Sequence, residues 1–200
     1  MRKLAAFGAL AVGAVAMWWG KNPSACPYSQ RFWVEAPHPL ITRDRLRQIL
    51  EPQPGERVLE IGPGTGYYTL DLAGWVGEHG AIEIFDIQQE MLDHTIRRAR
   101  ERGLENVNPT RGDAQDLGWD DDGFDAAILI TVLGEIHDQD AALREVARVL
   151  KPGGRLIVGE LLGDPHYVTP GSLERRAEAA GLRFDRRAGP KFGYFARFRA

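Results

Sequence analysis

From residue 55 onward, short apolar runs alternate with longer stretches in which apolar residues recur every three or four positions. The short runs predict buried β-strands, and the longer stretches predict amphipathic helices. The predicted strands are 57–61, 81–86, 106–111, 124–130 and 154–161, and the predicted helices are 40–50, 66–76, 88–102, 138–150 and 171–180. Strands and helices that alternate with short loops indicate an α/β fold with a doubly wound, mainly parallel, Rossmann-like sheet.

The carboxy-terminal part has a different pattern. Leu182 to Arg187 and Phe192 to Phe198 alternate apolar and polar residues on either side of Gly189-Pro190. Two such runs around a turn predict an antiparallel hairpin. With the five earlier strands, the hairpin gives a seven-stranded sheet.

The amino-terminal segment is apolar without interruption. Met1-Arg2-Lys3 precedes seventeen uncharged residues, 4–20, which include Trp18-Trp19 near their end. This length is at the short limit for a bilayer-spanning helix, and paired tryptophans are typical of the membrane interface. A cleaved signal peptide is the alternative, although small residues are expected where the tryptophans stand. We expect an uncleaved N-terminal hydrophobic helix over 1–20 that anchors the protein in the membrane.

Three units follow from these patterns: the anchor at 1–20, a linker and cap helix at 21–54, and one α/β domain at 55–200. Basic residues are slightly more numerous after the apolar segment than before it, which favours a domain on the cytoplasmic side of the membrane. A cytoplasmic protein without an anchor is the alternative. The sequence leaves the oligomeric state open.

A glycine-rich turn follows the first predicted strand of the domain. The strand carries Glu60 near its end, and Gly62, Gly64 and Gly66 lead into a helix. Glycines let a ligand approach the backbone, and the amino end of a helix attracts an anion. A ligand with a carboxylate and a positive charge suits these groups, as in the aminocarboxypropyl part of S-adenosylmethionine. A dinucleotide loop would have its third glycine where Tyr67 stands, which argues against a nicotinamide cofactor.

Composition excludes several other classes. The formal net charge of −3 does not favour nucleic acid as a partner. A single cysteine, Cys26, excludes an intrachain disulfide framework, and no metal-ligand spacing is present. We therefore expect no metal site.

Four further motifs complete a known pattern. Asp86 ends the second strand, Gly112-Asp113-Ala114 follows the third, Phe124-Asp125 begins the fourth, and 150–156 reads Leu-Lys-Pro-Gly-Gly-Arg-Leu. With the glycine turn, these motifs resemble the class I S-adenosylmethionine-dependent methyltransferases, in particular the ubiquinone/menaquinone-biosynthesis and methyltransferase type 11 groups. The resemblance covers about residues 55–162.

The resemblance implies that the cofactor is S-adenosylmethionine and that the protein is a methyltransferase. It places Glu60 and the three glycines around the methionine moiety and Asp86 on the ribose. Asp113 and Ala114 are then expected near the adenine, and Ile87 is expected to be a further cofactor-binding residue. Proteins that methylate a protein or nucleic acid, and non-catalytic nucleotide-binding modules, remain alternatives.

Candidate proton acceptors follow the fourth and fifth strands. We expect His137 and His166 to act as a pair at the rim of the site, because neighbouring parallel strands end at the same edge. The other candidates are Glu135, Asp138, Asp164, Tyr167 and His38. Loops are short, and only residues 28–40 are expected to cover the site. An open site beside a membrane anchor favours a small hydrophobic or membrane-associated acceptor, such as a quinone precursor, a lipid, or a lipophilic thiol or amine.

Overall fold

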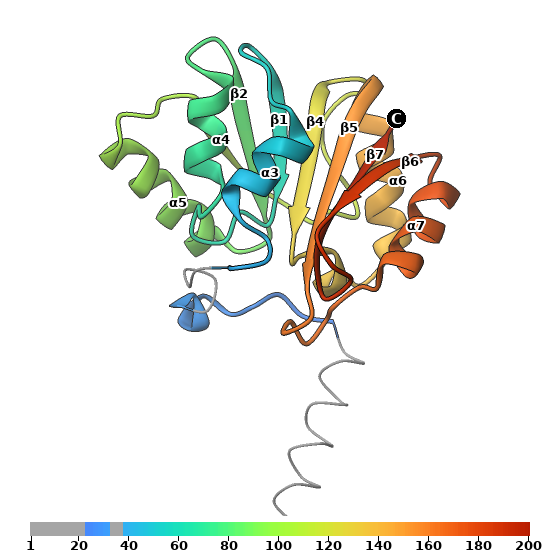
Figure 1. Ribbon diagram of the computed structural model, residues 1–200. Helices are drawn as coiled ribbons and strands as arrows, with labels where there is room; N and C mark the ends of the chain where they lie inside the picture. Colours follow the sequence, from blue (N-terminus) through green and yellow to red (C-terminus); the bar gives the residue numbers. More distant parts are fainter. Residues whose placement is uncertain (1–22, 33–37) are drawn as a thin grey trace, which may run out of the picture.

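The computed structural model describes residues 23–32 and 38–200. Their strands form one seven-stranded sheet (Figure 1). The strand order is β3-β2-β1-β4-β5-β7-β6, and β7 is antiparallel to both of its neighbours. The strands are β1 Arg57–Ile61, β2 Ala81–Asp86, β3 Val107–Arg111, β4 Phe124–Ile130, β5 Leu150–Leu161, β6 Arg183–Ala188 and β7 Gly193–Arg199. The predicted doubly wound sheet and its carboxy-terminal hairpin are therefore confirmed.

Helices cover both faces of the sheet. The α-helices are α3 Arg43–Leu50, α4 Thr69–Val76, α5 Gln89–Glu101, α6 Gln139–Val149 and α7 Pro170–Ala179, and the 3-10 helices are η1 Tyr28–Gln30 and η2 Leu133–Glu135. Apolar residues of α3, α4 and α5 share one core cluster, and those of α6 and α7 share the other. β1 supplies both clusters, since Val58 points to the first and Leu59 to the second.

The carboxyl ends of β1 to β5 lie at one edge of the sheet, the lower edge in Figure 1. We call it the carboxyl edge. The strand order reverses between β1 and β4, and such a reversal opens a crevice in which open α/β sheets bind ligands.

Three boundaries differ from the prediction by three or more residues. The helix expected from residue 40 begins at Arg43 as α3. The helix expected from residue 66 begins at Thr69, because the glycines are in left-handed conformations and residues 64–68 form turns. The strand expected from residue 154 begins at Leu150 as β5, and its pairing with β4 shifts register between Phe124 and Ala126. Gly153 takes a φ of +77° there, so the strand bends without ending.

The predicted hydrophobic helix over 1–20 lies outside the residues that the structure describes, so the anchor stays a prediction. Across the described ranges 23–32 and 38–200, none of the helices has both the length and the apolar character needed to span a bilayer.

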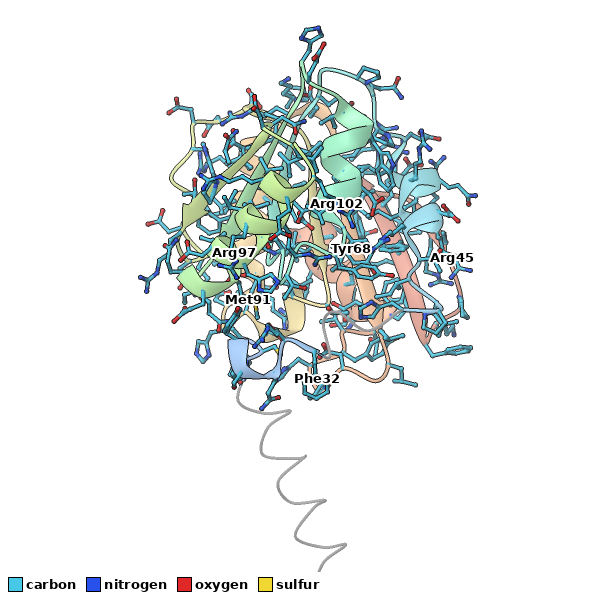
Figure 2. All side chains as sticks on the ribbon, turned by 90° about the vertical axis from the view of Figure 1, so that its left-hand side faces the viewer. Phe32, Arg45, Tyr68, Met91, Arg97 and Arg102 are labelled. Carbon is cyan, nitrogen blue, oxygen red and sulfur yellow. The ribbon has the colours of Figure 1, made fainter. Side chains whose placement is uncertain are left out.

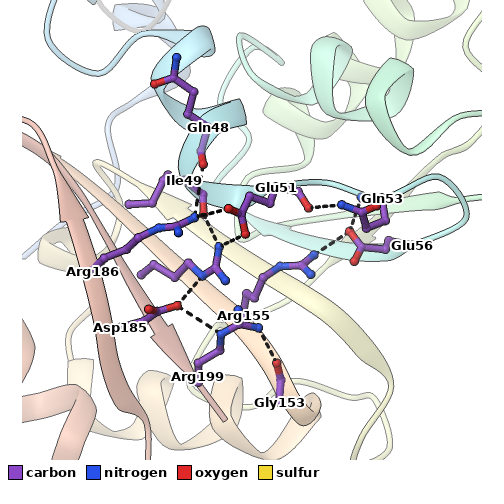
Figure 3. Close-up of polar contacts among 11 residues, drawn as sticks. Gln48, Ile49, Glu51, Gln53, Glu56, Gly153, Arg155, Asp185, Arg186 and Arg199 are labelled. Atoms are coloured by element: carbon purple, nitrogen blue, oxygen red, sulfur yellow. Dashed lines mark hydrogen bonds and ion pairs between the residues drawn. The ribbon is translucent and has the colours of Figure 1, made fainter.

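The end of α3 is tied to the carboxy-terminal hairpin by a charged network (Figure 3). Arg197 of β7 is 2% exposed, and its Nη1 lies 2.7 Å from Glu51 Oε2 and donates to the Ile49 carbonyl at 2.9 Å. Its Nε lies 2.8 Å from Asp185 Oδ2, and Arg186 reaches Glu51 Oε1 at 2.8 Å. Since removing one partner would leave a buried charge uncompensated, this network fixes α3 on the sheet.

Candidate active site

The turn from β1 to α4 is shaped by its glycines. Gly62 and Gly66 have φ values of +68° and +81°, which side chains rarely adopt. A Cβ on Gly62 would lie 2.3 Å from Val132 Cγ2, so the turn also packs closely against the end of β4. No side chain caps the start of α4 at Tyr68. The first turn of α4 can therefore present backbone N–H groups to an anionic ligand.

Glu60 is buried beneath this turn, with 3% exposure. Thr69 Oγ1 donates a hydrogen bond of 2.5 Å to Glu60 Oε2. Burial raises the pKa of Glu60 to about 7, and the bond from Thr69 opposes that rise. A positively charged group beside this buried carboxylate would stabilise its ionised form. The positive amino group of S-adenosylmethionine fits this requirement.

Asp86 ends β2 at the same edge. The N–H of Gln88 donates to Asp86 Oδ1 at 2.8 Å. Burial raises the pKa of Asp86 to about 6, against the hydrogen bonds from the Gln88 and Ile87 amides. Ile87 leaves 53% of its surface exposed next to this carboxyl. A carboxylate beside an exposed apolar side chain fits a ribose followed by a flat base.

The predicted adenine residues come after β3. The N–H of Gly112 donates to the Asp86 carbonyl at 3.1 Å, which brings the ends of β2 and β3 together. Ala114 is buried in the core, with 8% exposure. Asp113 is exposed, and both of its carboxylate oxygens lie 2.9 Å from Gln115 Nε2. Their predicted contact with the adenine stays a prediction.

A segment from the amino-terminal side crosses the carboxyl edge (Figure 1). We call residues 23–32 the amino-terminal strap. Gln88 holds it with both amide atoms, donating to the Cys26 carbonyl at 2.9 Å and accepting from the Tyr28 N–H at 3.2 Å. The Cys26 N–H donates to Glu135 Oε2 at 3.3 Å, and the Tyr28 hydroxyl lies 3.0 Å from His94 Nδ1. The strap therefore joins the cofactor side, at Gln88, to the end of β4.

Three carboxyl groups, Glu135, Glu160 and Asp164, gather near the ends of β4 and β5, and we call them the carboxyl trio. Burial, followed by the charge of Asp164, raises the pKa of Glu135 to about 8. Burial raises the pKa of Glu160 to about 8 although the Val168 N–H donates to it at 3.1 Å. Burial also raises the pKa of Asp164. The pKa values of Glu135 and Glu160 therefore lie close to neutral pH.

The order of these features matches a known family. The model of the ubiE/COQ5 methyltransferase family matches residues 37–164, more than half of the chain. The chain belongs to this family. Members of the ubiE/COQ5 family use S-adenosylmethionine, so the predicted family and cofactor are confirmed.

Curated relatives in the family carry the name ubiquinone/menaquinone biosynthesis C-methyltransferase UbiE. The protein from Vibrio campbellii is 40% identical over 109 residues, which are 54% of this chain and 42% of that protein. The protein from Shewanella oneidensis is 38% identical over 122 residues, 60% of this chain and 49% of that protein. The chain thus spans less than half the length of the curated relatives it matches.

Solved structures agree on the fold. A methyltransferase from Aquifex aeolicus superposes with a TM-score of 0.79 at 21% identity, covering 88% of this chain and 98% of that one. The [4+2]-cyclase SpnF superposes with a TM-score of 0.70 at 24% identity, covering 78% of each chain. At these identities the likeness shows the Rossmann-like methyltransferase fold and no particular reaction.

In this ubiE/COQ5 chain the two predicted histidines differ in setting. His137 is exposed in the loop between η2 and α6. His166 is half-buried, and its N–H donates to Asp164 Oδ1 at 2.7 Å. The His166 carbonyl packs on η2 so closely that a Cβ on Gly134 would lie 1.7 Å from its oxygen. The loops after β4 and β5 are thus in contact, and the catalytic role of both histidines stays a prediction.

His38 lies beside the glycine turn. It lines a small pocket with Glu60, Gly62, Tyr67 and Thr131, and its ring centroid lies 5.1 Å from that of Tyr67. Burial lowers the pKa of His38, which favours its neutral ring. Its Nδ1 is buried and has no hydrogen-bond partner among the described residues. A neutral ring nitrogen of this kind can accept a hydrogen bond from a ligand.

Sequence reasoning did not find Glu160 or Gln88. Glu160 is a single acid in the otherwise apolar strand 156–161, a pattern that signals a buried polar group only when the strand is known to lie inside the sheet. Gln88 has no signal in the sequence, because its role depends on the strap passing over it.

Proposed function

We propose that the protein transfers the methyl group of S-adenosylmethionine to a small hydrophobic or amphiphilic acceptor, with a quinone precursor as the first candidate. The observation that carries the proposal is the meeting of Glu60, Asp86 and the carboxyl trio at one edge under the amino-terminal strap. The charge distribution supports a small acceptor over nucleic acid, because the net charge is −3.

S-adenosylmethionine, when bound, would supply an electrophilic methyl group. Glu60 and the start of α4 would hold its amino and carboxylate groups, and Asp86 would hold its ribose. Ile87 would lie against its base. The strap would cover one side of the site and exclude water, which supports alignment of the acceptor.

Glu135 is placed to handle the proton that the acceptor loses. It ends η2, the 3-10 helix after β4, and the negative charge of Asp86 contributes to its raised pKa, so the two carboxyls lie near one another. A general base works best when its pKa is close to the operating pH, and Glu135 has a pKa of about 8. His38, His137 and His166 are the competing groups.

The acceptor class is drawn from two lines of support. The curated relatives are named as C-methyltransferases of ubiquinone and menaquinone biosynthesis, and this name makes a quinone precursor the first candidate. The apolar sequence over 1–20 would in addition bring the domain to the cytoplasmic face of a membrane, where lipophilic acceptors are concentrated. A lipid, or a lipophilic thiol or amine, fits the same open site.

The test is to incubate the full chain with bacterial membranes and S-adenosylmethionine that carries a labelled methyl group. Label is expected in the lipid extract, in a fraction that absorbs as a quinone or quinol. The Asp86→Ala variant serves as the matched control and should transfer much less label. Label in protein, or no transfer by a protein that calorimetry shows to bind the cofactor, would overturn the proposed acceptor class.

A further inference from the structure

Large apolar side chains are exposed at one edge of the domain. Among residues 23–32 and 38–200, those more than half exposed are Phe32 at 58%, Ile87 at 53%, Leu162 at 60% and Phe192 at 51%. Phe32 lies on the strap, Ile87 follows β2, Leu162 follows β5, and Phe192 precedes the antiparallel β7. All four are therefore at the carboxyl edge, and Figure 2 shows Phe32 at its lowest part.

One of the four already has an expected cover, since Ile87 is placed against the adenine. Leu162 and Phe192 are neighbours, because the Leu162 N–H donates to the Phe192 carbonyl at 2.9 Å. We call Phe32, Leu162 and Phe192 the apolar rim. Exposed apolar groups gathered on one side of a domain mark a surface for a partner or a membrane.

Basic residues stand beside the apolar rim. Arg31 precedes Phe32, and its guanidinium lies 4.8 Å from the centre of the Tyr28 ring. Lys191 precedes Phe192 and is exposed. An aromatic side chain next to a cation suits the boundary of an anionic bilayer, because the ring enters the interface while the cation meets the lipid phosphates.

The course of the chain points to the same partner. Residues 4–20 are uncharged and mostly apolar, and the described part of the chain begins at Pro23. Cys26, three residues later, is hydrogen-bonded to Glu135 and Gln88 at the carboxyl edge. The apolar sequence therefore joins the domain on the edge that carries the apolar rim.

We propose that the carboxyl edge is a membrane-binding surface, whose apolar rim enters the interface of an anionic bilayer while Arg31 and Lys191 contact its headgroups. This surface goes beyond the proposed methyl transfer and does not depend on the identity of the acceptor. Its consequence is that the mouth of the site faces the lipid, so a lipophilic acceptor would reach the carboxyl trio without crossing water.

The experiment measures which edge meets the lipid in the full chain. In a Cys26→Ser background, Leu162→Cys or Phe192→Cys carries an environment-sensitive fluorophore. His79→Cys, in a side chain 88% exposed in the turn before β2, gives the matched label on the opposite edge. Vesicles of phosphatidylcholine and phosphatidylglycerol with nitroxide-labelled lipid are added to each protein.

Quenching at positions 162 and 192, and little at 79, is the expected result. Equal quenching at the three positions, or none, would overturn the proposal, since residues 1–20 alone would then hold the chain or no binding would occur. Emission changes that grow with protein concentration in the absence of lipid would instead assign the apolar rim to a second copy of the chain.

A second measurement removes the rim itself. The double variant Leu162→Ser, Phe192→Ser should lower partitioning into anionic vesicles by about 10-fold, because interfacial binding scales with the apolar area inserted. Its affinity for S-adenosylmethionine in calorimetry should equal that of the wild type, which separates this proposal from the methyl-transfer proposal. Unchanged partitioning in the folded double variant would refute the membrane-binding surface.

Discussion

Replacing Glu160 by glutamine tests the electrostatics of the carboxyl trio. Glu160 is 1% exposed, one of its oxygens accepts from the Val168 N–H, and the other has no hydrogen-bond partner among the described residues. Glutamine keeps the shape and can still accept from Val168, but it removes the titration. The substitution therefore isolates the free energy of keeping a proton on this carboxyl.

The sign follows from the pKa values. Glu160 titrates near 4.5 when unfolded and near 8 when folded, so between these pH values the folded state binds one more proton. The free energy of unfolding must then fall as the pH rises, by about 1.4 kcal/mol per pH unit for one such group. Across the window from about 4.5 to about 8, the loss is on the order of 5 kcal/mol.

The assay is urea unfolding of the cofactor-free protein at pH values from 5 to 9. The wild type should lose stability steadily toward pH 8, and Glu160→Gln should lose less, with the difference largest above pH 8. Glu78→Gln is the matched control, because Glu78 is 88% exposed and should leave the slope unchanged. If Glu160→Gln and the wild type gave parallel curves, Glu160 would not hold its proton and the reasoning about the trio would be wrong.

Three further predictions concern binding, packing and the proton. Asp86→Ala should weaken S-adenosylmethionine binding about 10- to 150-fold, since two ribose hydroxyls lose a charged acceptor, and unchanged affinity in calorimetry would refute the ribose assignment. Gly134→Ala should destabilise the fold by about 1–3 kcal/mol in urea, because its Cβ would lie 1.7 Å from the His166 carbonyl oxygen; unaltered stability would show that the loop gives way freely. His137→Ala or His166→Ala should lower kcat about 10²–10⁴-fold with constant cofactor affinity if that histidine is the base. If both histidine variants keep the kcat of the wild type and Glu135→Gln loses about 10²–10⁴-fold, the general base is Glu135.

The strands were predictable because burial leaves a simple trace in the sequence. β1, β2 and β4 have the predicted bounds, since each is an apolar run between polar or glycine-rich turns. The glycine turn and Asp86 were predictable for a related reason. The turn directly follows β1 and Asp86 ends β2, and strand ends are where open α/β sheets bind ligands. The start of α4 was misplaced, because the residues after Gly66 suit a helix but the turn geometry delays it to Thr69.

The rest of the site depends on contacts that no local pattern records. Glu135 ends η2 and Glu160 lies in β5, and their raised pKa values arise only when the fold buries them together. The strap has no periodic pattern, and hydrogen bonds to Gln88 and Glu135, more than 60 residues away, hold it in place. Such contacts are properties of the folded chain, so the sequence alone does not report them.

The charged network around Arg197 has a consequence for the order of folding. Arg197 and Glu51, which follows the end of α3, are 146 residues apart. The segment just before α3 is held as well, because the Tyr68 hydroxyl donates to the Ile41 carbonyl at 2.6 Å. Tyr68 adjoins the glycine turn, so one wall of the cofactor site rests on a helix that β7 secures. Contacts of such long separation form late. A chain emerging from the ribosome would therefore complete its cofactor site only after β7 has left the exit tunnel, although the family match already ends at residue 164.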